Sequence, residues 1–137
     1  MIVDVDCNIL VMCLTSRSNY HLIYQSLVNK QFQLVITTDI LLEYEEIIQA
    51  KYNIKTANNF TTLLIELPNV TFINNYYRWN LIEVDPDDNK YCDCAIAGKA
   101  DYIVTEDKHF NFLKSIDFPK LTVISIDDFV EILKTMP

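Results

Sequence analysis

Short apolar runs alternate with helical patterns along this chain, and that alternation limits its possible folds more than any other feature. Strands are expected at residues 1–6, 33–37, 70–73, 102–105 and 121–124. Helices are expected at residues 8–14, 20–28, 40–48, 56–66, 87–99, 110–116 and 127–134. Such alternation is typical of a parallel sheet with helices on both faces. The sequence therefore predicts an α/β fold, an α/β/α sandwich around a central parallel sheet of about four or five strands.

Length and composition restrict the classes of protein that fit. Residues 81–84 fit either a further strand or an extended loop, and the whole chain, residues 1–137, fits one domain. A single glycine rules out a glycine-rich phosphate loop. No apolar run approaches the roughly 20 residues that span a bilayer, and the N-terminus lacks the pattern of a signal peptide. We therefore expect a cytoplasmic protein without a membrane segment, whose four cysteines are buried free thiols.

Four acidic residues fall where a parallel sheet would bring them together. Asp6 ends the first strand, and Asp107 follows the strand that ends at Thr105. Glu43 and Asp88 lie near the starts of two helices. Right-handed crossovers place the carboxyl ends of all strands at one edge of the sheet, where ligands bind in open α/β sheets. Carboxylates gathered there repel one another unless a divalent cation with oxygen ligands binds them, so these four residues are candidate ligands of Mg²⁺ or Mn²⁺.

Each acid also has an ordinary structural interpretation, which its own position leaves open. Asp6 and Asp88 are placed to cap helices, Asp107 suits a turn, and Glu43 suits the solvated face of a helix. Periodicity does not separate Glu43 from Glu45. Glu43 is preferred because it lies roughly 3 Å nearer to the start of its helix, and hence to the strand ends.

Asp88 is the most informative of these acids because it heads an inward-facing stripe of its helix. A charged group in that position needs a partner, and Lys90 is expected to point away from it. Asp93 lies roughly 140° further around the helix and is a weaker candidate. His109 lies close to the fourth acid in sequence, but a lone histidine in a turn is more often neither a base nor a ligand. A bound cation is the partner that this pattern favours.

Four short motifs, in this order, resemble those of the PIN-domain nucleases. The first is Asp6-Cys7-Asn8-Ile9-Leu10, and the second is Leu41-Leu42-Glu43-Tyr44. The third is Asp85-Pro86-Asp87-Asp88-Asn89 with the following Ala95-Ile96-Ala97, and the fourth is Ala100-Asp101-Tyr102-Ile103-Val104-Thr105-Glu106-Asp107. Their order and spacing agree over essentially the whole chain. The bacterial PIN proteins that are toxin components of toxin–antitoxin pairs are similar to it.

The resemblance implies a PIN-like α/β/α sandwich and a metal-dependent endoribonuclease that uses Mg²⁺ or Mn²⁺ to cleave RNA, single-stranded or structured. It further implies a cognate antitoxin protein as partner and a homodimer. By matched position, the residues that it makes metal-binding and catalytic are Asp6, Glu43, Asp88 and Asp107. The residues that it makes supporting polar groups are Asn8 and Thr105.

Two positions depart from the family's pattern and keep other functions open. Cys7 stands where a threonine is usual, and Asp4 stands where an apolar residue is usual. Neither change removes a metal ligand, but a catalytically degenerate PIN-like module that binds protein or RNA is an alternative. A haloacid-dehalogenase-like phosphatase is a second alternative, because Asp4-Val5-Asp6 resembles its paired aspartates. Against it, the chain is short and has Asn8 where that family has a hydroxyl.

The net charge of −8 is unusual for a protein that binds nucleic acid, because phosphate binding usually needs a basic surface. The segment Tyr76-Tyr77-Arg78-Trp79 combines aromatic and basic side chains that suit base stacking or a protein interface. The candidate contacts to RNA or a partner chain are Arg78, Trp79, Lys90 and Lys108. The charge predicts RNA binding that is weak and sensitive to salt.

Overall fold

Five parallel strands form one sheet in the computed structural model, which describes residues 1–74 and 76–137. The strands are β1 (Ile2–Val5), β2 (Gln33–Ile36), β3 (Val70–Phe72), β4 (Tyr102–Val104) and β5 (Val123–Ile124). Their order across the sheet is β3-β2-β1-β4-β5, and each neighbouring pair is parallel. Central β1 pairs Val3 with Leu34 on one side and with Tyr102 on the other. The predicted α/β fold with a parallel sheet is confirmed.

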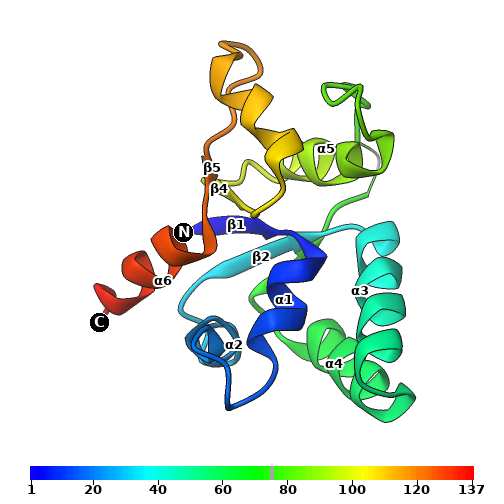
Figure 1. The fold of residues 1–137 in the computed structure, drawn as a ribbon, viewed down its shortest axis with the longest axis vertical. Coiled ribbons are helices and arrows are strands. Elements are labelled where there is room, and N and C mark those ends of the chain that lie inside the picture. The colour runs from blue at the N-terminus through cyan, green and yellow to red at the C-terminus, as the bar shows by residue number, and fades with distance from the viewer. Residues whose placement is uncertain (75) are drawn as a thin grey trace.

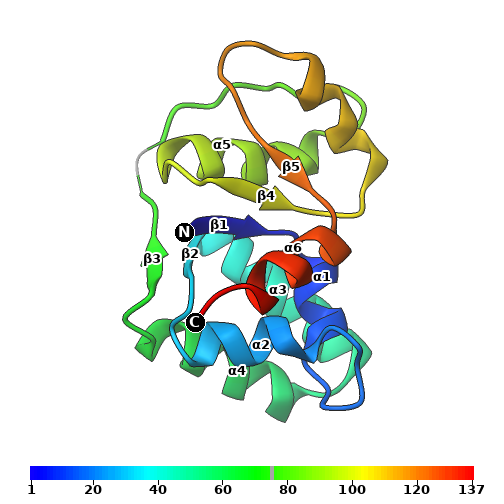
Figure 2. The same ribbon diagram turned by 90° about the vertical axis from the view of Figure 1, so that its left-hand side faces the viewer.

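Helices cover both faces of this sheet. They are α1 (Cys7–Cys13), α2 (His21–Val28), α3 (Thr38–Lys51), α4 (Ile54–Glu66), α5 (Asn89–Ala97) and α6 (Ile126–Lys134). Helix α5 lies on one side of the strands, and α1, α2, α4 and α6 lie on the other (Figures 1 and 2). Three helices start at side-chain caps, where Thr37, Asn53 and Ser125 each accept a hydrogen bond from a backbone N–H three residues later.

Two segments differ from the prediction in kind. The helix expected at residues 87–99 is a 3₁₀ turn, η1 (Pro86–Asp88), followed by α5. Pro86 opens that turn, and proline is well suited to the first position of a helix because its missing N–H would have no partner there. The short helix expected at residues 110–116 is 3₁₀, η2 (Lys108–Ser115). Residues 81–84, which fitted either a strand or a loop, form a loop. The Asn89 side chain accepts the N–H of Ile82 and donates to its carbonyl, so neither group is available to a neighbouring strand.

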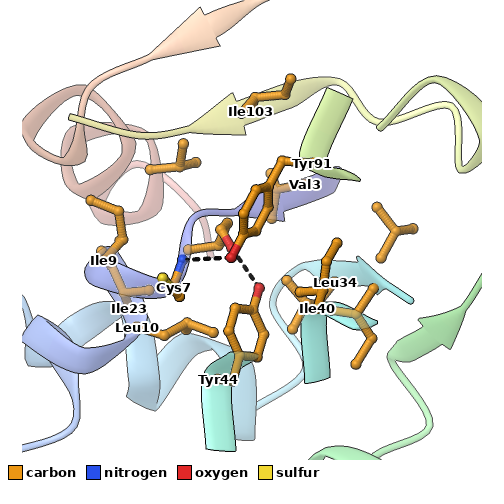
Figure 3. Packing of buried hydrophobic residues seen from close by; sticks show 14 of the residues in the cluster. Val3, Cys7, Ile9, Leu10, Ile23, Leu34, Ile40, Tyr44, Tyr91 and Ile103 are labelled. Carbon is orange, nitrogen blue, oxygen red and sulfur yellow. Dashed lines mark hydrogen bonds between the residues drawn. The ribbon is translucent and has the colours of Figure 1, made fainter. Parts of the chain in front are cut away.

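The buried core extends up to the carboxyl ends of β1 and β4. Two tyrosines approach each other there, Tyr44 from α3 and Tyr91 from α5 (Figure 3). The Tyr44 hydroxyl donates to the carbonyl of Val5, and the Tyr91 hydroxyl accepts the N–H of Cys7 at 3.3 Å. All four cysteines are buried free thiols, as predicted. In the part of the chain that the structure describes, no helix combines the length and apolar character needed to cross a membrane.

Candidate metal centre

Asp6 and Thr105 meet where β1 and β4 end. The Asp6 N–H donates to the carbonyl of Val104 at 3.0 Å, which continues the pairing of the two strands by one residue. The Thr105 hydroxyl donates to Asp6 Oδ2 at 2.9 Å and accepts the N–H of Asp107 at 3.0 Å. Although Asp6 precedes α1, its side chain caps no N–H of that helix. The helix-cap interpretation of Asp6 is therefore wrong, and Thr105 is the residue that orients its carboxylate.

Glu43 reaches the same place from the second turn of α3. One oxygen of Asp6, one oxygen of Glu43 and the sulfur of Cys7 all lie within 4.8 Å of one another. The Tyr91 hydroxyl donates to Glu43 Oε1 at 2.5 Å, and the Lys90 ammonium forms an ion pair with Oε2. Glu45 lies elsewhere on α3 and accepts a hydrogen bond of 3.4 Å from Thr61 of α4. The position of Glu43 along the helix axis therefore identified the acid that reaches the strand ends.

The expectation that Lys90 points away from the acids is wrong. Its side chain is only 23 % exposed, and its ammonium contacts the Glu43 carboxylate. The reason is the long stem of lysine, which lets the charged head bend back to the nearest carboxylate whatever the direction of its Cα–Cβ bond. Helices α3 and α5 pack against each other, so that carboxylate lies within reach.

A second group of donors surrounds His109. Its Nδ1 lies 3.2 Å from Asp88 Oδ2, 3.3 Å from Asp107 Oδ1 and 4.0 Å from Asp85 Oδ2. Asp88 precedes α5 without capping it through its side chain, whereas Asp107 does accept the N–H of His109 at 2.9 Å. Asp107 therefore caps a turn, as its position in the sequence indicates, and it also lies among the acids. His109, which was expected to be neither a base nor a ligand, and Asp85, which was not among the predicted ligands, therefore belong to this group.

The acids of the two groups influence one another's ionisation. Burial raises the pKa of Asp6, hydrogen bonds from Thr105 and Cys7 oppose this, and the charges of Glu43 and Asp107 raise it further. Burial together with the charges of Asp107, Asp85 and Asp6 raises the pKa of Asp88 to about 6, against the hydrogen bond to His109. The predicted repulsion among clustered carboxylates is therefore present.

Glu43 behaves differently from the other acids. Burial alone would raise its pKa, but hydrogen bonds from Cys7, Lys90 and Tyr91 outweigh burial and hold the pKa below its ordinary value. Glu43 therefore stays ionised at neutral pH without a metal. Burial and the neighbouring acids raise the pKa of the Cys7 thiol, which keeps it protonated and a poor ligand. The remaining donors are carboxylate oxygens and one imidazole, and oxygen-rich sites of this kind suit Mg²⁺ or Mn²⁺.

The other predicted site residues lie outside these two groups. Asn8 is exposed, and none of the hydrogen bonds among the described residues involves its side chain. Arg78 and Lys108 are exposed as well. Trp79 is half-buried, and its ring packs edge-on against Phe118 with 5.8 Å between ring centroids. Trp79 is therefore partly covered by the chain's own residues.

Two further aspartates that were not among the predicted ligands, Asp93 and Asp4, are buried. Asp93 is 4 % exposed and accepts the N–H of Trp79 at 2.9 Å, so it anchors the loop before η1. Asp4 is completely buried beneath the strand ends. A phosphatase of the paired-aspartate type needs both acids at the substrate, so the burial of Asp4 excludes that alternative.

Comparison with known families decides the class of protein to which this arrangement belongs. The family model described as the PIN domain matches residues 3–109. The chain belongs to the PIN domain family. PIN domains are typically nucleases and generally use divalent metal ions. No curated protein sequence matches this PIN domain.

A solved structure with the same fold is that of VapBC2 from Rickettsia felis bound to a DNA fragment from their promoter. The match has a TM-score of 0.60 and 17 % sequence identity, and it covers 91 % of this chain and 98 % of that one. At this identity the likeness establishes the PIN fold of the chain. The fold places the family's acidic motifs at the strand ends, where the two donor groups are found.

Asp88→Asn is expected to leave this PIN domain as stable as the wild type, or more stable, in metal-free buffer at pH 7.5. A raised folded pKa means that the stability contributed by protonated Asp88 is present below its unfolded pKa of roughly 3.9 and is lost as pH rises through about 6. Asparagine avoids that loss and can still accept a hydrogen bond from His109. Thermal melting with a chelator at pH 5 and pH 7.5 measures the effect, and a large destabilisation at pH 7.5 would show that Asp88 is a structural residue.

Proposed function

We propose that this PIN domain is an endoribonuclease that requires Mg²⁺ or Mn²⁺ and cleaves RNA. The observation that supports the proposal most is the convergence of Asp6, Glu43, Asp88 and Asp107, from four separate segments, at the carboxyl edge of the sheet. The charges of neighbouring acids raise the pKa values of Asp6 and Asp88, which costs folding free energy when both are ionised. A divalent cation bound among these acids would offset that cost and would lie where it could polarise a phosphodiester.

The proposed roles follow from the contacts of each side chain. Asp6, Glu43, Asp88 and Asp107 would hold the metal, which when bound supplies Lewis-acid chemistry and lowers the pKa of a bound water. The Thr105 hydroxyl fixes the orientation of Asp6 and, through the N–H of Asp107, the start of η2.

Lys90 is proposed to act beside these acids without itself holding the metal. Its ammonium keeps Glu43 ionised and brings a positive charge to a protein that is otherwise strongly acidic. That charge would help to offset the repulsion between the RNA backbone and the acids. Arg78 and Lys108, both exposed, are proposed as weaker contacts to RNA or to a partner chain.

We further propose that the chain is the toxin component of a toxin–antitoxin pair, with a cognate antitoxin protein as partner. The support is the shared fold over nearly the full length of the matched chain in the VapBC2 structure. A homodimer and a cytoplasmic location stay predictions. Light scattering on the purified chain, alone and after co-expression with a candidate antitoxin, tests the assembly.

Cleavage assays on a panel of RNAs test the central proposal. The wild type is expected to cleave single-stranded RNA with Mg²⁺ or Mn²⁺, and to stop cleaving when a chelator is added. Activity should fall as salt is raised, because each phosphate that a cationic side chain contacts releases a counterion on binding and salt opposes that release. Chelator-resistant cleavage by pure protein would contradict the proposed metal dependence.

Metal binding should also be visible without any substrate. Mg²⁺ or Mn²⁺ is expected to raise the melting temperature of the wild type, because a ligand that binds only the folded state stabilises it by about 2.7 kcal/mol at 100 times its Kd. The shift should be much smaller for Asp88→Asn, which removes a proposed ligand. Differential scanning fluorimetry over a metal titration measures both, and equal shifts in the two proteins would place the metal elsewhere.

A further inference from the structure

We propose that a pocket beside the metal centre binds one nucleobase of the RNA substrate. The pocket has a volume of about 280 Å³ and is lined by Leu81, Ile82, Glu83, Val84, His109 and Phe112. This inference rests on the proposed function and goes further, since it assigns a place to the base next to the phosphodiester that is cut.

The position of the pocket carries the first step. His109 forms part of its wall, and the Nδ1 atom of the same residue lies 3.2 Å from Asp88 and 3.3 Å from Asp107. The pocket and the donor group therefore share a side chain. A nucleotide whose phosphate lies at the acids has its base within reach of this wall. The volume of about 280 Å³ lies just below the range of about 300–1,000 Å³ for ligand sites, which suits one base better than a larger ligand.

The chemistry of the lining carries the second step. Leu81, Ile82, Val84 and Phe112 are apolar, and the ring of Phe112 is 58 % exposed. Glu83 would repel a phosphate inside the pocket itself, so the part of a nucleotide that this pocket attracts is the base. Proteins that recognise single-stranded RNA stack its splayed bases on aromatic side chains in this way.

The pocket is also preformed and tied to the acids. Asn89, directly after Asp88, accepts the N–H of Ile82 at 2.8 Å and donates to its carbonyl at 2.9 Å. These two bonds fix the apolar wall to the start of α5. A base bound there would consequently be held in a defined position relative to Asp88, which is what a specificity subsite requires.

Phe118 is an exposed phenylalanine outside the pocket and serves as a comparison for Phe112. Phe118 is 80 % exposed but packs on Trp79, which in turn packs on Tyr77. Among the described residues, Phe112 belongs to no such aromatic pair, so its ring is available to a base. Phe118→Ala is therefore the control for Phe112→Ala, with the same chemical change outside the pocket.

The test measures kcat/KM on a short single-stranded RNA and on versions with one abasic nucleotide at each position in turn. One abasic position should lower kcat/KM by about 5–150-fold in the wild type and in Phe118→Ala, since base–aromatic stacking is worth about 1–3 kcal/mol. With intact RNA, kcat/KM of Phe112→Ala should be lower than that of the wild type by a similar factor. Removing the base at that position should then lower kcat/KM of Phe112→Ala hardly any further. Such coupling supports the subsite.

Failure of the subsite is distinguishable from failure of the proposed nuclease. If the wild type cleaves but the abasic losses are the same in all three proteins, no base occupies the pocket and the nuclease proposal stands. Anisotropy of the same RNAs bound to Asp6→Asn, with and without Phe112→Ala, reports the coupling when no cleavage occurs. If Phe112→Ala changes only self-association, the pocket belongs to a protein interface and the nucleobase proposal is overturned.

Discussion

Asp6→Asn is expected to lower the rate of RNA cleavage by at least about 10³-fold, which corresponds to about 4 kcal/mol of lost transition-state stabilisation. The substitution removes a negative charge and a proposed metal ligand from the point where β1 and β4 end. It leaves the fold intact, because asparagine can still accept the hydrogen bond from Thr105. Stability in metal-free buffer should be equal or higher, since burial and neighbouring acids disfavour the charged form of Asp6. Cleavage assays and thermal melting measure the two quantities.

Glu45→Gln is the matched control for that experiment. It makes the same carboxylate-to-amide change on α3, but Glu45 faces Thr61 of α4 and not the strand ends. Its cleavage rate should stay within about twofold of the wild type, because surface substitutions away from special features have small effects. If Asp6→Asn cleaves RNA as fast as the wild type, in a preparation free of contaminating nuclease, the proposed active site is wrong.

Hydrophobic periodicity predicted the fold because the central strands are short, mainly apolar runs. Val3, Val5, Leu34 and Ile36 are fully buried, and such runs between helices fit only a parallel sheet covered on both faces. The chain direction of that sheet then placed the acids at one edge. The position of Asp6 and of the turn after Thr105 needed nothing more than this topology.

The parts of the site that the sequence did not reveal depend on side-chain reach and on irregular backbone. Lys90 bends back to Glu43, which no helical wheel shows. Asp85 and His109 meet Asp88 at the starts of the 3₁₀ elements η1 and η2, whose direction periodicity cannot predict. The one available signal was the spacing of His109 two residues after Asp107, which suits a side-chain capped turn.

Asp4→Val is expected to stabilise the protein by about 1–3 kcal/mol at neutral pH and to raise its melting temperature by several degrees. Asp4 is completely buried in central β1, and neither of its carboxyl oxygens has a hydrogen-bond partner within the described residues. Its surroundings include Tyr44, Cys92 and Cys94, whose pKa values are raised by burial and further by the charge of Asp4. Valine has a high preference for strands and a similar size, so it removes the unpaired polar group without leaving a large cavity.

The stabilisation by Asp4→Val should grow as pH rises, and this dependence separates the cost of a buried charge from a general gain in packing. Burial, and secondly the charge of Asp6, raises the pKa of Asp4 well above its ordinary value. The stability that protonated Asp4 contributes to the wild type is therefore fully present below its unfolded pKa of roughly 3.9 and is lost as pH rises through the folded pKa. Urea unfolding with a chelator at pH 5 and pH 8 should show a larger difference in the free energy of unfolding between Asp4→Val and the wild type at pH 8.

Ser26→Ala is the control. Ser26 has a buried hydroxyl without a partner among the described residues but does not titrate in this range, so the effect of its substitution should be the same at both pH values. A gap for Asp4→Val that does not change with pH would mean that ionisation of Asp4 contributes nothing to the stability of this fold.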